Sequence, residues 1–390
     1  MKLKLNANFF KEKLNKDFIS NNFGKQYLYN KDFLQNTSSI MSLDILNEVL
    51  SMSSNWNNQN FVMMLDKERI KYNEYSSLSL EASGQFMRPD PEKVQNWVSK
   101  GASIILNDID KANSGLINIS NQLQDITNGR CQGNLYFSMQ SRQAFGPHCD
   151  VHDVFAIHFE GEKVWNIYEN IENNPINHPL FKYSSEERIK KAGRMIDQIT
   201  LKPGDLLYLP RGQYHDALAS KSGSIHIAFG LTYFKPIDLM GVIWEKLILN
   251  DFMRTDFNKN STKENLKNNL KTLSKELEKI IDNDQTKEVL FDSIQKWPYK
   301  IKNYSLNHIV LEGRKYKVSK SIKIEKNGLQ TYLTNGKDKV MIPKDYLDLT
   351  TYILKQDFIT FNSVKSNFKN LPENTLKEAI ENLENMKVIY

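Results

Sequence analysis

The stretch Gly146-Pro147-His148-Cys149-Asp150-Val151-His152-Asp153-Val154-Phe155 decides how the rest of the sequence is interpreted. Gly146 and Pro147 interrupt regular structure, and a run that alternates polar and apolar residues follows them. In an extended strand, side chains two apart share a face, so His148 and Asp150 are predicted to point the same way. The stretch therefore offers one imidazole and one carboxylate to a common point.

A second imidazole is that of His215, which follows the apolar strand Leu206–Leu209 and the turn residue Gly212 in the sequence. Two histidines and one carboxylate form the set that binds Fe(II) on one side and leaves the other side open. We therefore predict a metal site made by His148, Asp150 and His215. A His-x-Asp pair alone is a weak signal, and the competing interpretation is three ordinary polar side chains at strand ends.

Other potential ligands lie close to this set. His152 continues the alternation of His148 and Asp150 and is a competitor, although it lies farther along the strand. His158 and His226 lie on strand-like runs, where a histidine is more often a core or surface residue than a ligand. Cys149 is predicted to face away from its neighbours and to be a packed thiol.

Length, charge and cysteine content limit the class of protein. The chain has 390 residues, which favours two or three domains. Its formal net charge of +6 is small for this length, so nucleic-acid binding is not expected. No apolar run is long enough for a membrane helix, and two cysteines do not form a disulfide framework. We expect a soluble cytoplasmic protein that does not bind membranes.

The pattern of apolar residues divides the chain into segments. Residues 1 to about 130 are predicted to be mostly helical, with one short strand at Ala102–Leu106. Residues 130–235 contain short strands separated by Gly and Pro turns, which is typical of a barrel or jelly roll. We therefore predict an α+β fold with domain boundaries near 1–235, 236–300 and 301–390.

The two later segments are predicted to have different roles. In 236–300, a stripe of leucines at steps of three and four residues indicates a helix-pair seam or a homodimer contact. The element order within 301–390 is that of a winged helix. Its last long helix is rich in glutamate, the wrong charge for phosphates, so a structural or protein-contact role is favoured over DNA binding.

An iron site of this type needs a reductant that binds beside it. A keto-acid cosubstrate with a distal carboxylate requires a cation, helped by a hydroxyl group. Lys163 begins the strand 163–168 and shares a face with Trp165 and Ile167, which is unusual for a solvated lysine. Tyr136, on the strand before the metal pair, can supply the hydroxyl. Taken alone, Lys163 would be a surface residue.

These motifs carry a resemblance to a known family. The segments that carry it are 134–136, 146–155, 160–165, 202–210 and 212–215. Together with their spacing, they resemble the JmjC-type, cupin-fold Fe(II)/2-oxoglutarate oxygenases, and most closely the ribosomal oxygenases. The similarity in sequence extends to Thr232. Beyond it, the order of the segments, middle helices followed by a winged-helix-like C-terminus, is also that of the family.

The resemblance implies a double-stranded β-helix core over 1–235, a helical dimerisation segment over 236–300 and a winged-helix-like domain over 301–390. It implies that Lys163 and Tyr136 bind 2-oxoglutarate, that Asn134 lies near it and that Thr232 lies near the metal. The cosubstrates are 2-oxoglutarate and O2. Many bacterial members have arginine where this sequence has Lys163.

The resemblance also implies an activity, the hydroxylation of a side chain of a protein or peptide. The substrate is a ribosomal protein or, equally well, a natural-product precursor peptide. Lysine demethylation uses the same iron chemistry and is the first alternative. The second is a non-catalytic cupin that binds a ligand or acts as a scaffold.

Overall fold

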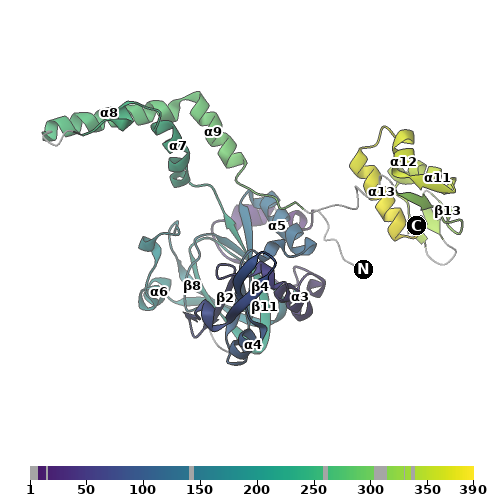
Figure 1. Cartoon of the computed structure of the whole chain (residues 1–390), viewed down its shortest axis with the longest axis horizontal. Helices are drawn as coiled ribbons and strands as arrows, with labels where there is room; N and C mark the ends of the chain where they lie inside the picture. The colour runs from purple at the N-terminus through teal and green to yellow at the C-terminus, as the bar shows by residue number, and fades with distance from the viewer. Residues whose placement is uncertain are drawn as a thin grey trace. The chain divides into compact units, whose positions relative to one another are not determined.

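The computed structural model describes residues 8–14, 16–139, 145–257, 262–302, 314–328, 330–334 and 339–390. The chain divides into two compact units, Met1–Ile301 and Lys302–Tyr390. Each unit is described by itself below, with the labels of Figure 1.

Two long strands, β8 (Asp153–Ile171) and β11 (Gln213–Thr232), form the centre of the first unit. They pair antiparallel along nearly their whole length. Strand β10 (Leu206–Leu209) pairs with the first half of β8, and β9 (Met195–Leu201) with its second half. Strand β7 (Arg130–Ser138) lies along the other edge of β11. This antiparallel arrangement fits the predicted α+β class.

The segment predicted to be mostly helical also supplies strands, which corrects that prediction. Four of them extend the main sheet in the order β1-β10-β8-β11-β7-β6-β2-β3. They are β1 (Leu28–Asn30), β2 (Phe61–Leu65), β3 (Glu68–Arg69) and β6 (Ser103–Leu106). Strands β4 (Ser76–Glu81) and β5 (Gly84–Pro89) form a separate hairpin. Strand β2 is apolar throughout, so it lacks the alternation that marks a half-exposed strand.

Three longer helices lie in the N-terminal segment, and each follows a residue whose side chain accepts a hydrogen bond from the first turn. They are α3 (Leu43–Ser51), α4 (Pro91–Ser99) and α5 (Ser114–Thr127). Ser42 accepts a hydrogen bond from Ile45 N at 3.3 Å, and Asn113 accepts one from Leu116 N at 3.0 Å. The shorter helices α1 (Phe9–Lys13), α2 (Lys16–Asn21) and α6 (Ser185–Ala192) complete the part of the unit that surrounds the sheet.

The alternation of side chains along β8 separates an outer core from the interior of the barrel. Phe155, Ile157 and Phe159 join the apolar cluster that includes the N-terminal helices. Val154 and Ala156, on the opposite face, join a second cluster with Trp165. Side chains of the second face therefore point inward, toward the candidate site.

Gly161 lies within a continuous strand, whereas the sequence suggested a turn that separates two strands. Its φ is +67°, and a Cβ atom there would lie 1.9 Å from the carbonyl oxygen of Gly223. Gly161 therefore allows β8 and β11 to approach closely where their pairing changes register, between Ala219 and Ser224. For the same reason, the predicted strand 224–231 is the second half of β11.

The helices after the barrel are α7 (Leu239–Leu247), α8 (Lys263–Asp282) and α9 (Asp284–Gln295). The three pack against one another. Trp297 joins them to the barrel, because its indole N–H donates to Thr232 O at 2.8 Å. Among the described residues, no helix is both long and apolar enough to cross a membrane.

The second unit has its own apolar core, built around Tyr316, Phe361 and Ile380. Its strands are β12 (Lys315–Lys317), β13 (Lys323–Asn327), β14 (Gln330–Thr334), β15 (Lys339–Met341) and β16 (Phe358–Thr360). Its helices are α11 (Leu347–Leu354), α12 (Phe361–Asn367) and α13 (Glu373–Asn385).

Candidate metal centre

His148 lies in the segment before β8, not on a regular strand as the sequence suggested. Pro147 has no N–H, and the nearest strand begins at Asp153. The backbone of His148 pairs with one residue, His215, through an isolated β-bridge. Each of these two residues donates its N–H to the carbonyl oxygen of the other, at 3.0 and 2.8 Å.

The ring orientation of both histidines is fixed by backbone carbonyl groups. Nδ1 of His148 lies 2.9 Å from Gly146 O, and Nδ1 of His215 lies 3.0 Å from Gln213 O. Because a carbonyl oxygen only accepts, each Nδ1 carries the hydrogen, and each Nε2 keeps a free lone pair. This is the tautomer that binds a metal ion through Nε2.

Asp150 completes the group. One carboxylate oxygen lies 3.6 Å from Nε2 of His215, and one potential ligand atom from each of His148, Asp150 and His215 lies within 4.8 Å of the others. His215 is buried, whereas one third of the Asp150 side chain is exposed. The predicted ligand set is therefore brought together with one open side.

The charges of the group suit a cation. Burial raises the pKa of Asp150, but the nearby His215, His152 and His148 outweigh burial and bring it below its usual value. Burial, with His148 close by, lowers the pKa of His215 to about 4. Near neutral pH, His215 is therefore neutral and Asp150 ionised, which are the protonation states of metal ligands.

Two neighbouring residues, His152 and Cys149, are not part of this ligand group. His152 is not part of the ligand group, and its ring packs over Gly230, where a Cβ atom would lie 2.8 Å from Cε1. Cys149 lies beside Tyr214, and burial raises the pKa of its thiol to about 11. Both residues match the roles expected from the sequence.

Lys163 lines the same cavity as the ligand group. Its side chain is 5% exposed, and its Nζ donates a long hydrogen bond of 3.5 Å to Ser138 Oγ. No acidic partner of Lys163 is present in the described part of the chain. Burial lowers the pKa of Lys163 to about 7. A buried cation that lacks an anionic partner is a favourable binding site for an anion.

Tyr136 lies next to this lysine. Nζ of Lys163 lies 5.9 Å from the centre of the Tyr136 ring, and burial raises the pKa of the Tyr136 phenol. The ring of His226 stacks on Tyr136. The cavity that these residues share has a volume of about 180 Å³. Its lining residues are Tyr136, Phe145, His148, Asp150, Val154, Lys163, Trp165, His215, Ala217, His226 and Ala228.

Reasoning from the sequence missed some of these residues. Ala217 and Val154 follow His215 and Asp150 at even spacing, a signal that was available. His226 was interpreted as a core or surface histidine. The change of register between Ala219 and Ser224 prevents the alternation from being extended from His215 to His226.

Two predicted cosubstrate residues lie outside the cavity. Asn134 lies two residues before Tyr136 on β7 and lines a separate polar hollow, and its buried Oδ1 has no hydrogen-bond partner among the described residues. Thr232 lies at the far end of β11 and donates a 3.4 Å hydrogen bond to Arg130 O. Thr232 lies four residues beyond Ala228 on β11 and is not among the residues that line the cavity, so its place near the metal stays a prediction.

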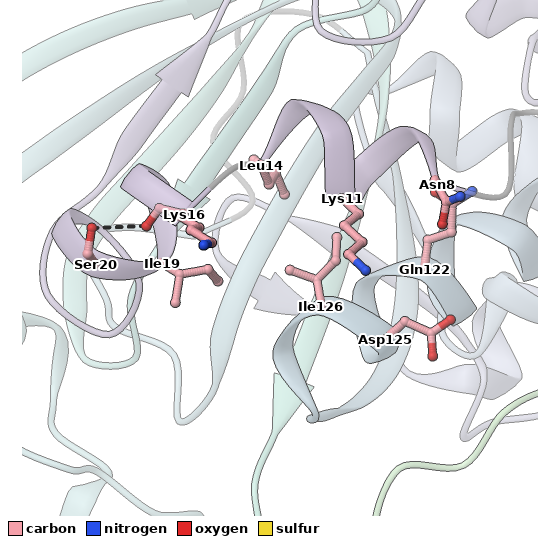
Figure 2. A pocket seen from close by; sticks show the side chains of 9 residues that line it. All are labelled: Asn8, Lys11, Leu14, Lys16, Ile19, Ser20, Gln122, Asp125 and Ile126. Carbon is pink, nitrogen blue, oxygen red and sulfur yellow. Dashed lines mark hydrogen bonds between the residues drawn. The ribbon is translucent and has the colours of Figure 1, made fainter.

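A larger hollow, of about 730 Å³, lies between the N-terminal helices α1 and α2 and helix α5 (Figure 2). Its one carboxylate, Asp125, forms an ion pair with Lys300 at 2.5 Å. The other charged side chains that line it are Lys11 and Lys16. Among the described residues, the lining of this hollow has no set of metal ligands, so the smaller cavity is the candidate for chemistry.

Replacement of one ligand tests the metal assignment. We expect His215→Ala to weaken Mn(II) binding more than about 100-fold, because a lost ligand costs at least as much as a lost supporting residue. His152→Ala is the matched control and should keep the affinity of the parent. The free Mn(II) signal in electron paramagnetic resonance measures both, with circular dichroism as the check on folding. Equal affinities for the parent and His215→Ala would contradict the assignment.

Comparison with known proteins agrees with this geometry. Residues 113–239 match the family model of the JmjC domain. The chain is 29% identical over 242 residues to the bifunctional lysine-specific demethylase and histidyl-hydroxylase NO66 of Dictyostelium discoideum, covering 60% of this chain and 44% of that protein. It is 33% identical over 123 residues to ribosomal oxygenase 2 of Bos taurus, covering 32% of this chain and 25% of that protein. The chain therefore spans less than half the length of these two relatives.

Solved structures of YcfD from Escherichia coli have a similar fold. One X-ray structure aligns over 100% of both chains with a TM-score of 0.52 and 14% identity. Another, described as a ribosomal oxygenase in complex with cobalt and 2-oxoglutarate, covers 96% of this chain and 97% of that chain, with a TM-score of 0.50 and 14% identity. The ligand geometry, the family match and the shared fold agree. Residues 113–239 are therefore similar to the JmjC domain, and the chain is similar in sequence to NO66 and ribosomal oxygenase 2 and in fold to YcfD.

Proposed function

We propose that this protein is an Fe(II)- and 2-oxoglutarate-dependent oxygenase that hydroxylates a side chain of a protein or peptide. The observation that carries the proposal is a single cavity with a metal-ligand set at its open side and an unpaired buried lysine. A dicarboxylate that reaches both features is the ligand this arrangement fits. The relatives named for demethylation, histidine hydroxylation and ribosomal oxygenation support the same chemistry.

In the proposed site, His148, Asp150 and His215 hold iron(II), which activates dioxygen when it is bound. Lys163 binds the distal carboxylate of 2-oxoglutarate, and the hydroxyl group of Tyr136 helps to bind the same carboxylate. The apolar walls formed by Val154, Trp165 and Ala228 exclude water from the bound cosubstrate. The overall reaction balances: a C–H bond of the substrate, 2-oxoglutarate and O2 give C–OH, succinate and CO2.

The relatives support two substrate outcomes. The name of the Dictyostelium relative includes both demethylation and histidine hydroxylation. We propose hydroxylation of a ribosomal protein or a precursor peptide as the first function and lysine demethylation as the second. Helix α13 carries Glu373, Glu378 and Glu381, which does not favour binding of nucleic-acid phosphates by this helix. We also propose a cytoplasmic location, and cell fractionation that recovers the protein elsewhere would contradict it.

Turnover tests the proposed activity. With Fe(II), 2-oxoglutarate and O2, the purified chain should form succinate slowly, and faster with its substrate. Lys163→Ala should raise the KM for 2-oxoglutarate about 10-fold or more, because a charge-assisted hydrogen bond is lost. Lys202→Ala, which removes an exposed lysine paired with Glu162, is the control.

The products distinguish the candidate functions. Mass spectrometry of ribosomal proteins and peptides from cells with and without the gene should show the gain of one oxygen atom. Loss of methyl groups would instead support demethylation. Tight 2-oxoglutarate binding without succinate formation, in the presence of iron and ribosomal proteins, would support a non-catalytic cupin.

The pKa of Lys163 predicts how cosubstrate binding depends on pH. Burial lowers this pKa to about 7 in the free protein, and a bound carboxylate raises it by favouring the charged amine. Below about pH 7 the lysine is already charged, so affinity stays constant. Above about pH 7, Lys163 must take up a proton when 2-oxoglutarate binds, so the affinity for 2-oxoglutarate falls by up to about tenfold per pH unit.

Calorimetry with Mn(II) between about pH 6 and pH 9 measures this dependence. Lys163→Arg should remove the dependence, because arginine stays charged over this range. A parent affinity that does not change across the range would contradict the role of Lys163.

We also propose that helices α7–α9 form a homodimer contact. No side chain of α8 is buried within the described chain, although its leucines form one face. The exposed apolar residues of the three helices include Met240, Trp244, Leu266, Leu270 and Phe291. A face of this kind is covered in most soluble proteins, and a second copy of the chain offers the same face.

Light scattering after size exclusion tests this contact. The parent should have twice the mass of one chain, and Leu270→Glu should reduce it to the mass of one chain, because a charge would be buried in the contact. Lys271→Glu, a charge change at the adjacent position of the same helix, is the control. A parent of single-chain mass at high protein concentration would contradict the dimer.

A further inference from the structure

His226 is a buried polar residue of the cavity that the proposed mechanism does not yet use. It lies on β11, directly opposite Tyr136 of β7 and His158 of β8. Its side chain is 3% exposed and lines the same cavity as Lys163 and Asp150. His226 therefore lies among the residues that would surround the cosubstrate.

Two aromatic rings hold the imidazole in one orientation. The ring of His226 is nearly parallel to that of Tyr136, at an angle of 8° and a centroid distance of 4.8 Å. Trp165 meets it edge-on, at 84° and 5.4 Å. A ring held between two others loses little conformational entropy when it binds a ligand, so this geometry is preorganised.

The hydrogen-bonding capacity of His226 is not fully used within the protein. Its Nδ1 is buried and has no hydrogen-bond partner among the described residues. Most buried polar atoms in proteins are paired, and exceptions are frequent at functional sites. The core-histidine interpretation predicts a partner for this nitrogen, and the structure does not provide one.

The surroundings of His226 offer donors without a matching acceptor. Burial, with Lys163 close by, lowers the pKa of His226 well below its usual value, so the ring is neutral and retains one N–H donor. The one carboxylate among the residues lining the cavity is Asp150, which belongs to the metal-ligand set. Lys163, Tyr136 and His226 therefore form a group of donors that lacks an anion.

We infer that His226 is a third cosubstrate-binding residue, which donates a hydrogen bond to the distal carboxylate of 2-oxoglutarate beside Lys163 and Tyr136. The inference rests on the proposed function and deepens it. A carboxylate has two oxygens that accept several hydrogen bonds, so three donors are compatible with one group. The same donors select a dicarboxylic keto acid, since a monocarboxylic one leaves all three without a partner.

Two substitutions separate this role from a purely structural one. His226→Phe keeps a ring that stacks on Tyr136 but removes the N–H donor. His226→Gln keeps a donor but removes the ring. Calorimetry with Mn(II) measures the Kd of 2-oxoglutarate for each variant without any need for turnover, and Mn(II) affinity and thermal unfolding show that the site is intact.

We expect His226→Phe to weaken 2-oxoglutarate binding about 10-fold or more, and His226→Gln to stay within about threefold of the parent. The preference for 2-oxoglutarate over pyruvate should shrink in His226→Phe by the same factor, because the lost bond belongs to the distal carboxylate. If His226→Gln weakens binding and His226→Phe does not, His226 acts only through stacking, and the inference is overturned. Parent-like binding by both variants overturns it as well.

Measurements on the parent protein and on Lys163→Ala distinguish a failure of this inference from a failure of the proposed function. A parent that does not bind 2-oxoglutarate with Mn(II) overturns both the proposed function and the inference. A parent that binds 2-oxoglutarate and loses it in Lys163→Ala, while His226→Phe binds normally, overturns the inference alone.

Discussion

Two backbone hydrogen bonds between His148 and His215 hold the candidate centre together. They join a segment that lies outside regular secondary structure to the start of β11, and Gly212 N adds a third bond to Asp150 O at 3.0 Å. With the backbones tied, the two imidazole rings lie 4.5 Å apart between centroids. The position of each metal ligand therefore depends on the pairing of backbones rather than on contacts between the ligands themselves.

The interior of the barrel has a separation of charge that follows from this arrangement. At the open side, Asp150 is ionised among histidines, a combination that suits a cation. Lys163 and His226 line the same cavity and are buried with no acidic partner among the described residues, a combination that suits an anion. Because burial of an unpaired charge is costly, each half of the cavity is poised for a ligand of opposite charge. A keto acid that ends in a carboxylate satisfies both halves at once.

The sequence was sufficient to find the ligand set even though the secondary structure around it was predicted wrongly. An extended segment outside a sheet keeps the alternation of a strand, so His148 and Asp150 still face one point. Lys163 was found because it alternates with Trp165, and that face is buried in the structure. Local periodicity indicated which side chains share a face, and the combination of residues with its resemblance to a family indicated their roles.

The features that were missed depend on contacts between distant parts of the chain. Gly161 has the signature of a turn, but its lack of a Cβ atom serves the close approach of Gly223. Thr232 was singled out from the sequence, yet it is not among the residues that line the cavity. His226 acquires its significance from the ring of Tyr136 on the neighbouring strand. Single-strand patterns do not contain such information.

The central claim is that one cavity binds a metal ion and a dicarboxylate together. A crystal structure of the full chain grown with Mn(II) and 2-oxoglutarate tests it most directly. We expect a metal ion bound by His148, Asp150 and His215, with the distal carboxylate of 2-oxoglutarate against Lys163. A metal ion held by other residues, or a carboxylate bound away from Lys163, would contradict it.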